Sequence, residues 1–272
     1  MKLRALVLSL VLVTGGCAAQ QKPATPEYTP EVGQAGKDVV WVPTALVLVN
    51  RMLDMAKVTS SDYVIDLGSG DGRTVIQAAK RGARAHGIEY NPDMVELSKR
   101  NAIKEGVTDK ATFANADIFQ SDFTQATVIT LFLLPDLNLK LRPTILGLKP
   151  GTRIVSNSFN MGEWEADDVL TADAKEGCTY WCIAHLWYVP ARVEGIWRTP
   201  QGELTLGQNF QKVSGSLKSA SGMTPVVDGK LKGEEISFRA GNAQYSGRVA
   251  GKTIQGTMTA GGKSATWTAT LP

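Results

Sequence analysis

Residues 64–72 have the sequence VIDLGSGDG, and this stretch decides the fold. An apolar run ends in the acid Asp66, and glycines follow at every second position, at 68, 70 and 72. Glycine adopts backbone conformations that a Cβ would block, and it lets a ligand approach the main chain closely. A loop of this kind, between a strand and a helix N-terminus, predicts a binding site for a nucleotide-type cofactor.

The spacing and charge of this loop narrow the choice of cofactor. The glycines follow the pattern G-x-G-x-G, whereas a dinucleotide site would have G-x-G-x-x-G. Asp71 would repel a phosphate and suits a cofactor with positive charge, such as the amino and sulfonium groups of S-adenosylmethionine. The pattern resembles motif I of the class I S-adenosylmethionine-dependent methyltransferases. The loop residues expected to bind this cofactor are Asp66, Gly68, Ser69, Gly70, Asp71 and Gly72.

Two more predicted strands end in acids. Glu89 ends the second strand, about twenty residues past the loop, where an acid hydrogen-bonds ribose hydroxyls. Asp117 ends the third strand, and the resemblance implies that it accepts a hydrogen bond from the adenine amino group while Ile118 covers the ring. Asn115 is placed in the same cofactor site. Each acid alone could be a helix cap, but three successive strand ends converge on the carboxyl edge of a parallel sheet.

The remaining elements complete an α/β pattern. Residues 126–134 form a nearly all-apolar run, as expected for a central parallel strand, and residues 152–159 predict a fifth strand. Helical patterns lie between the strands, so we expect a doubly wound, Rossmann-like sheet. Residues 180–189 predict a late antiparallel strand, and the whole methyltransferase domain is expected over residues 38–190.

Four segments give a closer resemblance. They are WVPT at 41–44, the glycine loop, LLP at 133–135 and VSNSF at 155–159, in that order. Together they resemble the small methyltransferases related to the Dot1 catalytic core. That group includes mitochondrial protein-lysine methyltransferases acting on the c-subunit of ATP synthase and on the adenine nucleotide translocase, together with bacterial relatives.

The resemblance implies further roles at the methyl-transfer end of the site. Pro43 and Thr44 would close over the methionine end of the cofactor, and Phe132, Leu134 and Pro135 would line the path to the methyl group. Alternatively, Pro43 only starts a helix and Pro135 only ends a strand. The implied function is in-line methyl transfer to a protein lysine or a similar amine. The alternatives are a small-molecule methyltransferase and an exported, non-catalytic module that binds a nucleoside-like ligand.

Other chemistries have less support in the sequence. His86 and His185 are expected to be structural, so no general base is assigned. No metal site is expected, because no second Cys/His pair has ligand spacing. Cys178 and Cys182 would lie about 13 Å apart in a continuous strand, beyond disulfide reach, so we expect two unbridged thiols.

The chain begins with a signal-peptide pattern over residues 1–19. A basic start precedes an apolar run and then small residues, and GGC at 15–17 resembles the end of a lipobox, with cleavage before Cys17. Cleavage after Ala19 is the alternative. Residues 20–37 predict a flexible linker. We therefore expect an exported protein, periplasmic or anchored to a membrane through its N-terminus. S-adenosylmethionine is made in the cytoplasm, so three alternatives stay open: the cofactor reaches the periplasm, the leader keeps the protein facing inward, or the fold serves as a binding module.

The composition changes over residues 191–272. Short β-type runs separated by glycines predict a small all-β domain, an antiparallel meander curled into a barrel or half-barrel. The runs lie at 193–198, 204–210, 213–217, 236–239, 245–249, 253–258 and 265–271. Trp197 and Trp267 are expected to fill its core. The domain is mildly basic within a chain of net charge +3. It shows no aromatic-basic stacking pattern, so no nucleic-acid partner is expected.

Overall fold

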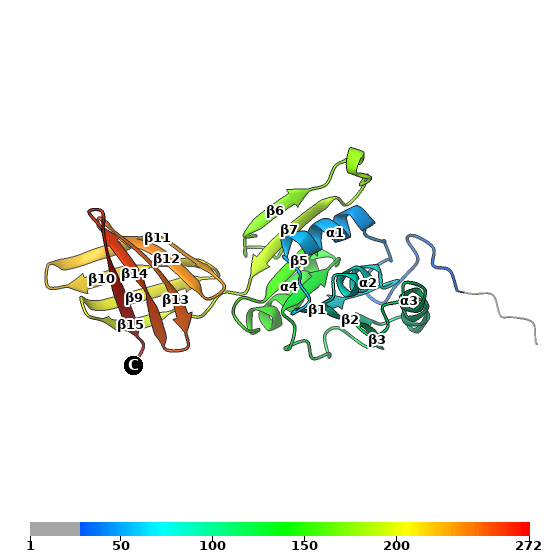
Figure 1. Ribbon diagram of the computed structural model, residues 1–272, viewed down its shortest axis with the longest axis horizontal. Helices are drawn as coiled ribbons and strands as arrows, with labels where there is room; N and C mark the ends of the chain where they lie inside the picture. Colours follow the sequence, from blue (N-terminus) through cyan, green and yellow to red (C-terminus); the bar gives the residue numbers. More distant parts are fainter. Residues whose placement is uncertain (1–27) are drawn as a thin grey trace, which may run out of the picture.

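The computed structural model describes residues 28–272, which form two parts (Figure 1). An α/β part comes first and a β-barrel follows it. The predicted signal peptide with Cys17, and the first part of the predicted linker, lie outside the described residues. Within residues 28–272, no helix is long and apolar enough to span a membrane. The same residues hold no cluster of His, Cys, Asp and Glu that could bind a metal ion.

The α/β part is built on a seven-stranded sheet. Its strands are β1 Tyr63–Leu67, β2 Arg84–Glu89, β3 Ala111–Asn115, β4 Val128–Leu131, β5 Arg153–Asn157, β6 Asp168–Thr171 and β7 Ile183–Tyr188. Their order is β3-β2-β1-β4-β5-β7-β6. The first five strands are parallel, and β7 runs antiparallel to β5. The doubly wound sheet and its late antiparallel strand are therefore confirmed, while β6 is an edge strand that the sequence did not predict.

Four helices cover the two faces of this sheet. They are α1 Leu46–Met55, α2 Arg73–Lys80, α3 Pro92–Lys104 and α4 Pro135–Leu146. The first three contribute to a core on one face, and α4 contributes to a core on the other. Asn91 caps α3, since its side chain accepts from the backbone N–H of Asp93 at 2.9 Å, and Pro92 follows it.

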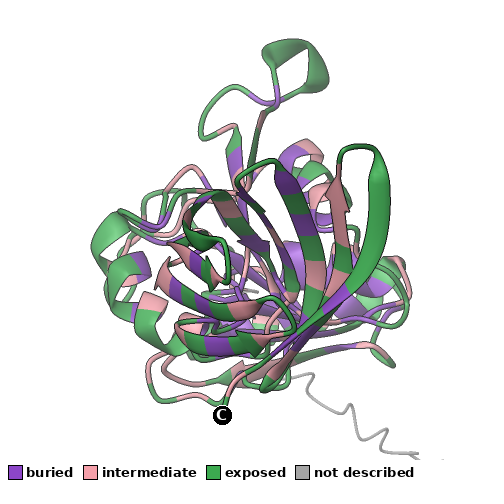
Figure 2. Ribbon diagram, turned by 90° about the vertical axis from the view of Figure 1, so that its left-hand side faces the viewer, coloured by how far each residue is buried: buried purple, intermediate pink, exposed green. Residues whose placement is uncertain are grey.

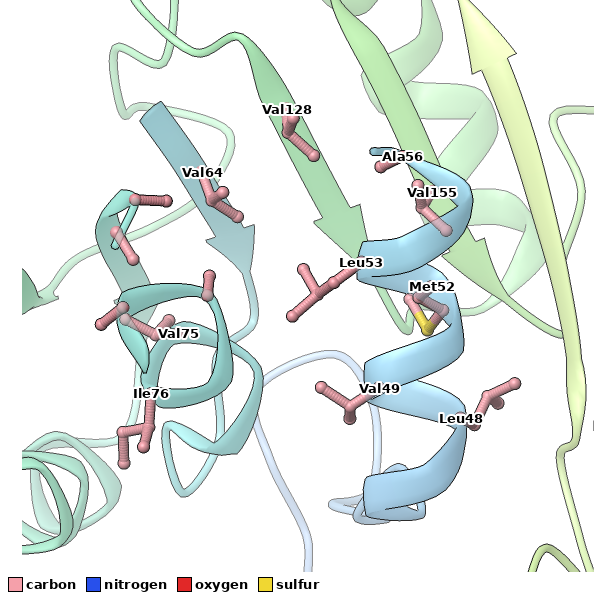
Figure 3. Close-up of a cluster of buried hydrophobic side chains, with 14 of the residues drawn as sticks. Leu48, Val49, Met52, Leu53, Ala56, Val64, Val75, Ile76, Val128 and Val155 are labelled. Carbon is pink, nitrogen blue, oxygen red and sulfur yellow. The ribbon is translucent and has the colours of Figure 1, made fainter. Parts of the chain in front are cut away.

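Helix α1 is fixed by apolar side chains at helical spacing. Leu48, Val49, Met52 and Leu53 are all buried, and they pack against α2 and the central strands. Figure 3 shows Leu53 pointing from α1 toward the neighbouring elements. Each such side chain contributes about 1.5–3 kcal/mol when fully buried. This packing holds the chain that precedes α1 at the edge of the sheet where the site lies.

Residues 195–270 form a closed antiparallel barrel. Its strands are β8 Gly195–Thr199, β9 Gly202–Asn209, β10 Lys212–Ser219, β11 Gly222–Lys232, β12 Glu235–Ala240, β13 Ala243–Ala250, β14 Thr253–Ala260 and β15 Lys263–Thr270. Buried and exposed residues alternate along the strands (Figure 2). Trp197 and Trp267 are buried in the barrel core, which confirms the expectation for both.

Strand β11 is the longest strand of the barrel, yet no β-type run predicts it. It contains Pro225, and its pairing with β12 shifts register between Val227 and Lys230. Asp228 lies in that bulge with a φ of 53°. Proline and a bulge break the alternation that identifies a strand in a sequence, so the strand was missed.

The two parts pack directly on each other. The ring of Trp164 stacks on Phe210 at 6.1 Å, and Gln211 donates to the carbonyl of Glu165 at 2.7 Å. Lys230 of the barrel pairs with the carboxylate of Asp167 at 3.4 Å. These contacts lie near the end of β7, which is beside the start of β5 and therefore at the amino edge of the parallel strands.

The expectation of two free thiols is wrong. Cys178 and Cys182 form a disulfide, with their Cα atoms 5.8 Å apart. The 13 Å spacing applies to a continuous strand, but β7 begins only at Ile183, and residues 178–182 form a turn. Trp181 in this turn has a φ of 57°, which reverses the chain enough to bring the two sulfurs together.

Candidate active site

A cavity of about 550 Å³ lies at the carboxyl edge of the parallel strands. One wall is the strap, residues 34–44, every one of which lines the cavity. The sequence assigned residues 34–37 to the flexible linker. They fold against the domain instead, since the Lys37 ammonium lies 2.8 Å from the Asp117 carboxylate and the backbone N–H of Trp41 donates to the Gln34 carbonyl at 2.9 Å.

The structure brings most of the expected site residues to this cavity. Those that line it are Pro43, Thr44, Asp66, Gly68, Ser69, Gly70, Asp71, Glu89, Asp117, Ile118, Phe132 and Leu134. Three others do not. Gly72 precedes α2 as its N-cap, Pro135 begins α4, and the Asn115 amide donates to the Tyr90 carbonyl at 2.6 Å. These three shape the surrounding chain.

The glycine loop is too tightly packed for side chains. Gly68 and Gly70 both have positive φ, and a Cβ on Gly70 would lie 2.7 Å from the Trp41 ring nitrogen. A Cβ on Gly72 would lie 2.8 Å from both Phe113 and Ser98. The loop can therefore pass under the strap and present its backbone to the cavity only because these residues are glycines.

Asp66 is the most electrostatically unusual residue of the site. Burial raises the pKa of its carboxyl to about 7, and the neighbouring carboxylates of Glu89 and Asp71 add to this effect. Hydrogen bonds from Thr130, at 2.6 Å, and from Thr74 oppose it. Within the described chain no ion pair involves Asp66, so a cation in the cavity would find an uncompensated buried carboxylate.

Glu89 ties two loops together from the end of β2. One carboxylate oxygen accepts from the backbone N–H of Gly70 and the other accepts from that of Asn91, both at 2.9 Å. Each oxygen of an ionised carboxylate has two acceptor positions. Glu89 can therefore orient the glycine loop and still accept from the hydroxyls of a ligand.

Asp117 has a partner that the sequence did not predict. The ammonium of Lys37, on the strap, lies 2.8 Å from its carboxylate. The Lys37 hydrogen bond holds the pKa of Asp117 below its usual range, and the backbone N–H of Phe119 adds to this. No sequence signal links residues 37 and 117, because Lys37 was assigned to the linker. An adenine amino group would have to share this carboxylate with Lys37.

Asp71, which was expected to suit a positively charged cofactor, lines the cavity but is paired with Arg73. The Arg73 guanidinium binds its carboxylate at 2.6 and 2.9 Å, and it donates to the Thr44 carbonyl at 2.8 Å. Thr44 in turn accepts from the amide of Asn157 at 3.1 Å. Asp71 therefore acts through Arg73 to fix the end of the strap, while its charge is largely neutralised.

The described residues fit S-adenosylmethionine. The buried Asp66 carboxylate suits a cationic group, and Glu89 suits ribose hydroxyls. Ile118 and Met94 offer apolar surface for an aromatic base beside Asp117. The fold and this cavity together define a class I S-adenosylmethionine-dependent methyltransferase.

Comparisons with known proteins identify the family. Residues 66–168 match the model of the ANTKMT methyltransferase domain. A protein-lysine N-methyltransferase of Saccharolobus islandicus is 41% identical over 138 residues, covering 50% of this chain and 86% of that protein. The human lysine N-methyltransferase named for the c-subunit of ATP synthase is 33% identical over 159 residues, covering 58% and 67%. The chain therefore belongs to this family of protein-lysine N-methyltransferases.

A solved structure agrees with the cofactor assignment. The crystal structure of an RNA methyltransferase from Salinibacter ruber, in complex with S-adenosylhomocysteine, is 44% identical to this chain, with a TM-score of 0.52. The match covers 56% of this chain and 96% of that one. The predicted cofactor and the predicted resemblance are both confirmed.

Aromatic residues at the far end of the cavity were largely missed. Phe132 was expected there, but Phe159 and Trp181 also line the cavity. Phe159 lies just after β5, and Trp181 lies in the disulfide-closed turn before β7. Phe159 ends the VSNSF segment that carries the family resemblance, but no role was assigned to it. A lone aromatic residue in a sequence is more often part of a core, so nothing marked Trp181 as a site residue.

Proposed function

We propose that the acceptor is the side-chain amine of a protein lysine. One end of the cavity, here called the aromatic wall, is apolar and mostly aromatic, and this supports a lysine acceptor. The aromatic wall consists of Phe132, Leu134, Leu137, Phe159 and Trp181. Such a wall suits the long alkyl stem of lysine. The names of the relatives from Saccharolobus islandicus and Homo sapiens support the same acceptor class.

The acidic and basic residues that line the cavity lie outside this aromatic wall. They are Lys37 and Asp38 of the strap, Asp66, Asp71 and Arg73 of the glycine loop and its flanks, and Glu89 and Asp117 at strand ends. The strands that carry these acids, β1 to β3, occupy one half of the sheet, and the aromatic wall follows β4, β5 and the turn before β7. Charge is therefore gathered on the cofactor side and apolar surface on the other.

The protein contributes to the reaction by positioning the two reactants and by excluding water from the site. Bound S-adenosylmethionine supplies a methyl group on a good leaving group. Asp66, Glu89 and the glycine loop hold the cofactor, and the aromatic wall holds the acceptor in line and excludes water. No described residue on the aromatic wall can accept a proton, and neither histidine lines the cavity. The amine must therefore lose its proton to solvent, which its entry into an apolar channel favours.

RNA is the other acceptor that a relative's name suggests. RNA binding relies on Lys and Arg contacts to phosphates and on stacked bases. The aromatic wall carries no Lys or Arg. The aromatic wall therefore favours a lysine side chain over RNA as the acceptor.

The acceptor class can be tested with S-adenosylmethionine that carries a labelled methyl group. We expect label on lysine side chains when the protein is incubated with envelope and cytoplasmic extracts, and mass spectrometry locates it. The rate with Nα-acetyl-L-lysine methylamide should rise about tenfold per pH unit from 7 toward 9, because the neutral amine is scarce below the lysine pKa. Label found only in RNA or only in small molecules would contradict the proposal, and Glu89→Ala serves as the inactive control.

We also propose that the protein is exported, either periplasmic or anchored through a lipid on Cys17. Two observations support this. The leader pattern of residues 1–19 is one. The other is the Cys178–Cys182 disulfide, since disulfides persist in oxidising compartments and are rare in the cytosol. Fractionation of producing cells tests the proposal, and recovery of the full-length chain in the cytosolic fraction alone would contradict it.

A further inference from the structure

A short disulfide-closed turn forms part of the cavity wall. Residues 178–182 have the sequence CTYWC, and Trp181 is the member that lines the cavity. Trp181 is 49% exposed, so it does not belong to the hydrophobic core. Its φ of 57° is unusual for a bulky residue, and such conformations gather at functional sites.

Trp181 completes a group of three aromatic rings. Its ring centre lies 5.4 Å from that of Phe159 and 6.2 Å from that of Phe132. The Phe132 and Phe159 rings stack at 6.2 Å. The rings come from three separate segments, yet all three line the same cavity. Aromatic groups of this kind hold alkyl chains by apolar contact and ammonium groups by attraction to the ring faces.

The backbone behind Phe159 is fixed from the other side. The buried amide of Asn138 donates to the carbonyls of Phe159 and Asn160, at 3.3 and 3.2 Å. Ser158 donates its backbone N–H to the Ile183 carbonyl at 2.7 Å. The chain that carries Phe159 is therefore held in place by ordinary hydrogen bonds.

Trp181 is held differently. Cys178 is buried in the core beneath α1, where it packs with side chains such as Ala172 and Ala184. Its bond to Cys182 closes the turn that carries Trp181. The next residue, Ile183, starts β7, so the disulfide joins the core to the start of the strand across the turn.

We propose that Trp181, with Phe132 and Phe159, holds the amine-bearing side chain of the acceptor, and that the Cys178–Cys182 disulfide positions Trp181 for this. The proposal rests on the proposed lysine acceptor. It makes Trp181 a determinant of acceptor affinity and gives both cysteines a positioning role. Acceptor affinity then depends on an intact disulfide, whereas cofactor affinity does not.

The test compares acceptor kinetics with cofactor binding in the full chain. We expect Trp181→Ala to raise the KM for Nα-acetyl-L-lysine methylamide at least about fivefold, which is roughly the effect of losing one aromatic contact. The double variant Cys178→Ser with Cys182→Ser should raise this KM by a similar factor. The Kd for S-adenosylhomocysteine should stay within about twofold. Trp181→Phe should restore part of the KM. Tyr180→Ala is the matched control, because Tyr180 belongs to the same turn, is 80% exposed and does not line the cavity.

A binding measurement separates this proposal from the proposed function. The same lysine amide should quench the tryptophan fluorescence of the wild type more than that of Trp181→Phe, and the norleucine analogue, which lacks the amine, should do so less. Quenching without methylation would contradict the lysine-acceptor function, but it would support binding of the amine by Trp181, Phe132 and Phe159. Methylation with an unchanged KM in Trp181→Ala would overturn the role of Trp181. Equal loss of S-adenosylhomocysteine binding in the variants would show a structural role instead.

Discussion

Replacing Glu89 by Ala is expected to weaken binding of S-adenosylhomocysteine about 100-fold, the largest effect of any single change at the site. The Glu89 carboxylate accepts the backbone N–H groups of Gly70 and Asn91, so its removal frees the glycine loop and leaves two donors without their partner. Hydrogen bonds to a charged group are worth about 1.5–3 kcal/mol each, and about 1.4 kcal/mol corresponds to tenfold in Kd. Isothermal titration calorimetry measures the change.

The control for this experiment is Glu96→Ala. Glu96 lies on α3, pairs with Lys99 on the surface and does not line the cavity. The substitution removes the same charge and side chain, so it should leave the Kd unchanged. Equal affinities for wild type and Glu89→Ala, in protein with an unchanged melting temperature, would remove Glu89 from the cofactor site.

Binding of S-adenosylhomocysteine is expected to weaken about tenfold between pH 8 and pH 6, because the free Asp66 carboxyl has a pKa of about 7. Burial favours the neutral acid in the free protein, whereas the cationic amino group of the ligand favours the carboxylate. Binding below pH 7 therefore requires release of a proton, and affinity falls as the pH drops. Above pH 7 the carboxylate is already ionised and the affinity levels off.

Asp66→Asn is the matched variant for the pH profile. Asparagine retains the size of the side chain and a hydrogen-bonding oxygen for Thr130, but it does not titrate. The variant should bind more weakly than the wild type at pH 8 and lose the dependence on pH between 6 and 8. A wild-type affinity that is the same at pH 6 and pH 8 would show that the ligand does not use the Asp66 charge.

The parts of the site that could be predicted are those that depend on short, contiguous sequence patterns. Asp66, Glu89 and Asp117 each end a predicted strand, and parallel strands bring their ends to one edge. The glycine loop is likewise a contiguous pattern. The alternating barrel strands were predicted for the same reason, apart from β11, whose bulge interrupts its period.

The missed parts depend on contacts between distant residues. Lys37 pairs with Asp117, which is 80 positions away in the sequence, and no local pattern around either residue indicates this pairing. Arg73 lies two residues from Asp71, yet nothing in the sequence shows that it joins this acid to Thr44. The disulfide was rejected because its loop was taken for strand, and Trp181 was overlooked with it. Fold was therefore more predictable than the fine pairing of charges within the site.

The barrel and the cavity lie at opposite ends of the α/β part. The barrel packs on the α/β part at the amino edge of the sheet (Figure 1), whereas the cavity and the strap lie at the carboxyl edge. The described chain begins on the cavity side, at residue 28. If the N-terminus is tethered to a membrane, the attachment is at the end of the α/β part that carries the cavity, and the barrel lies at the opposite end.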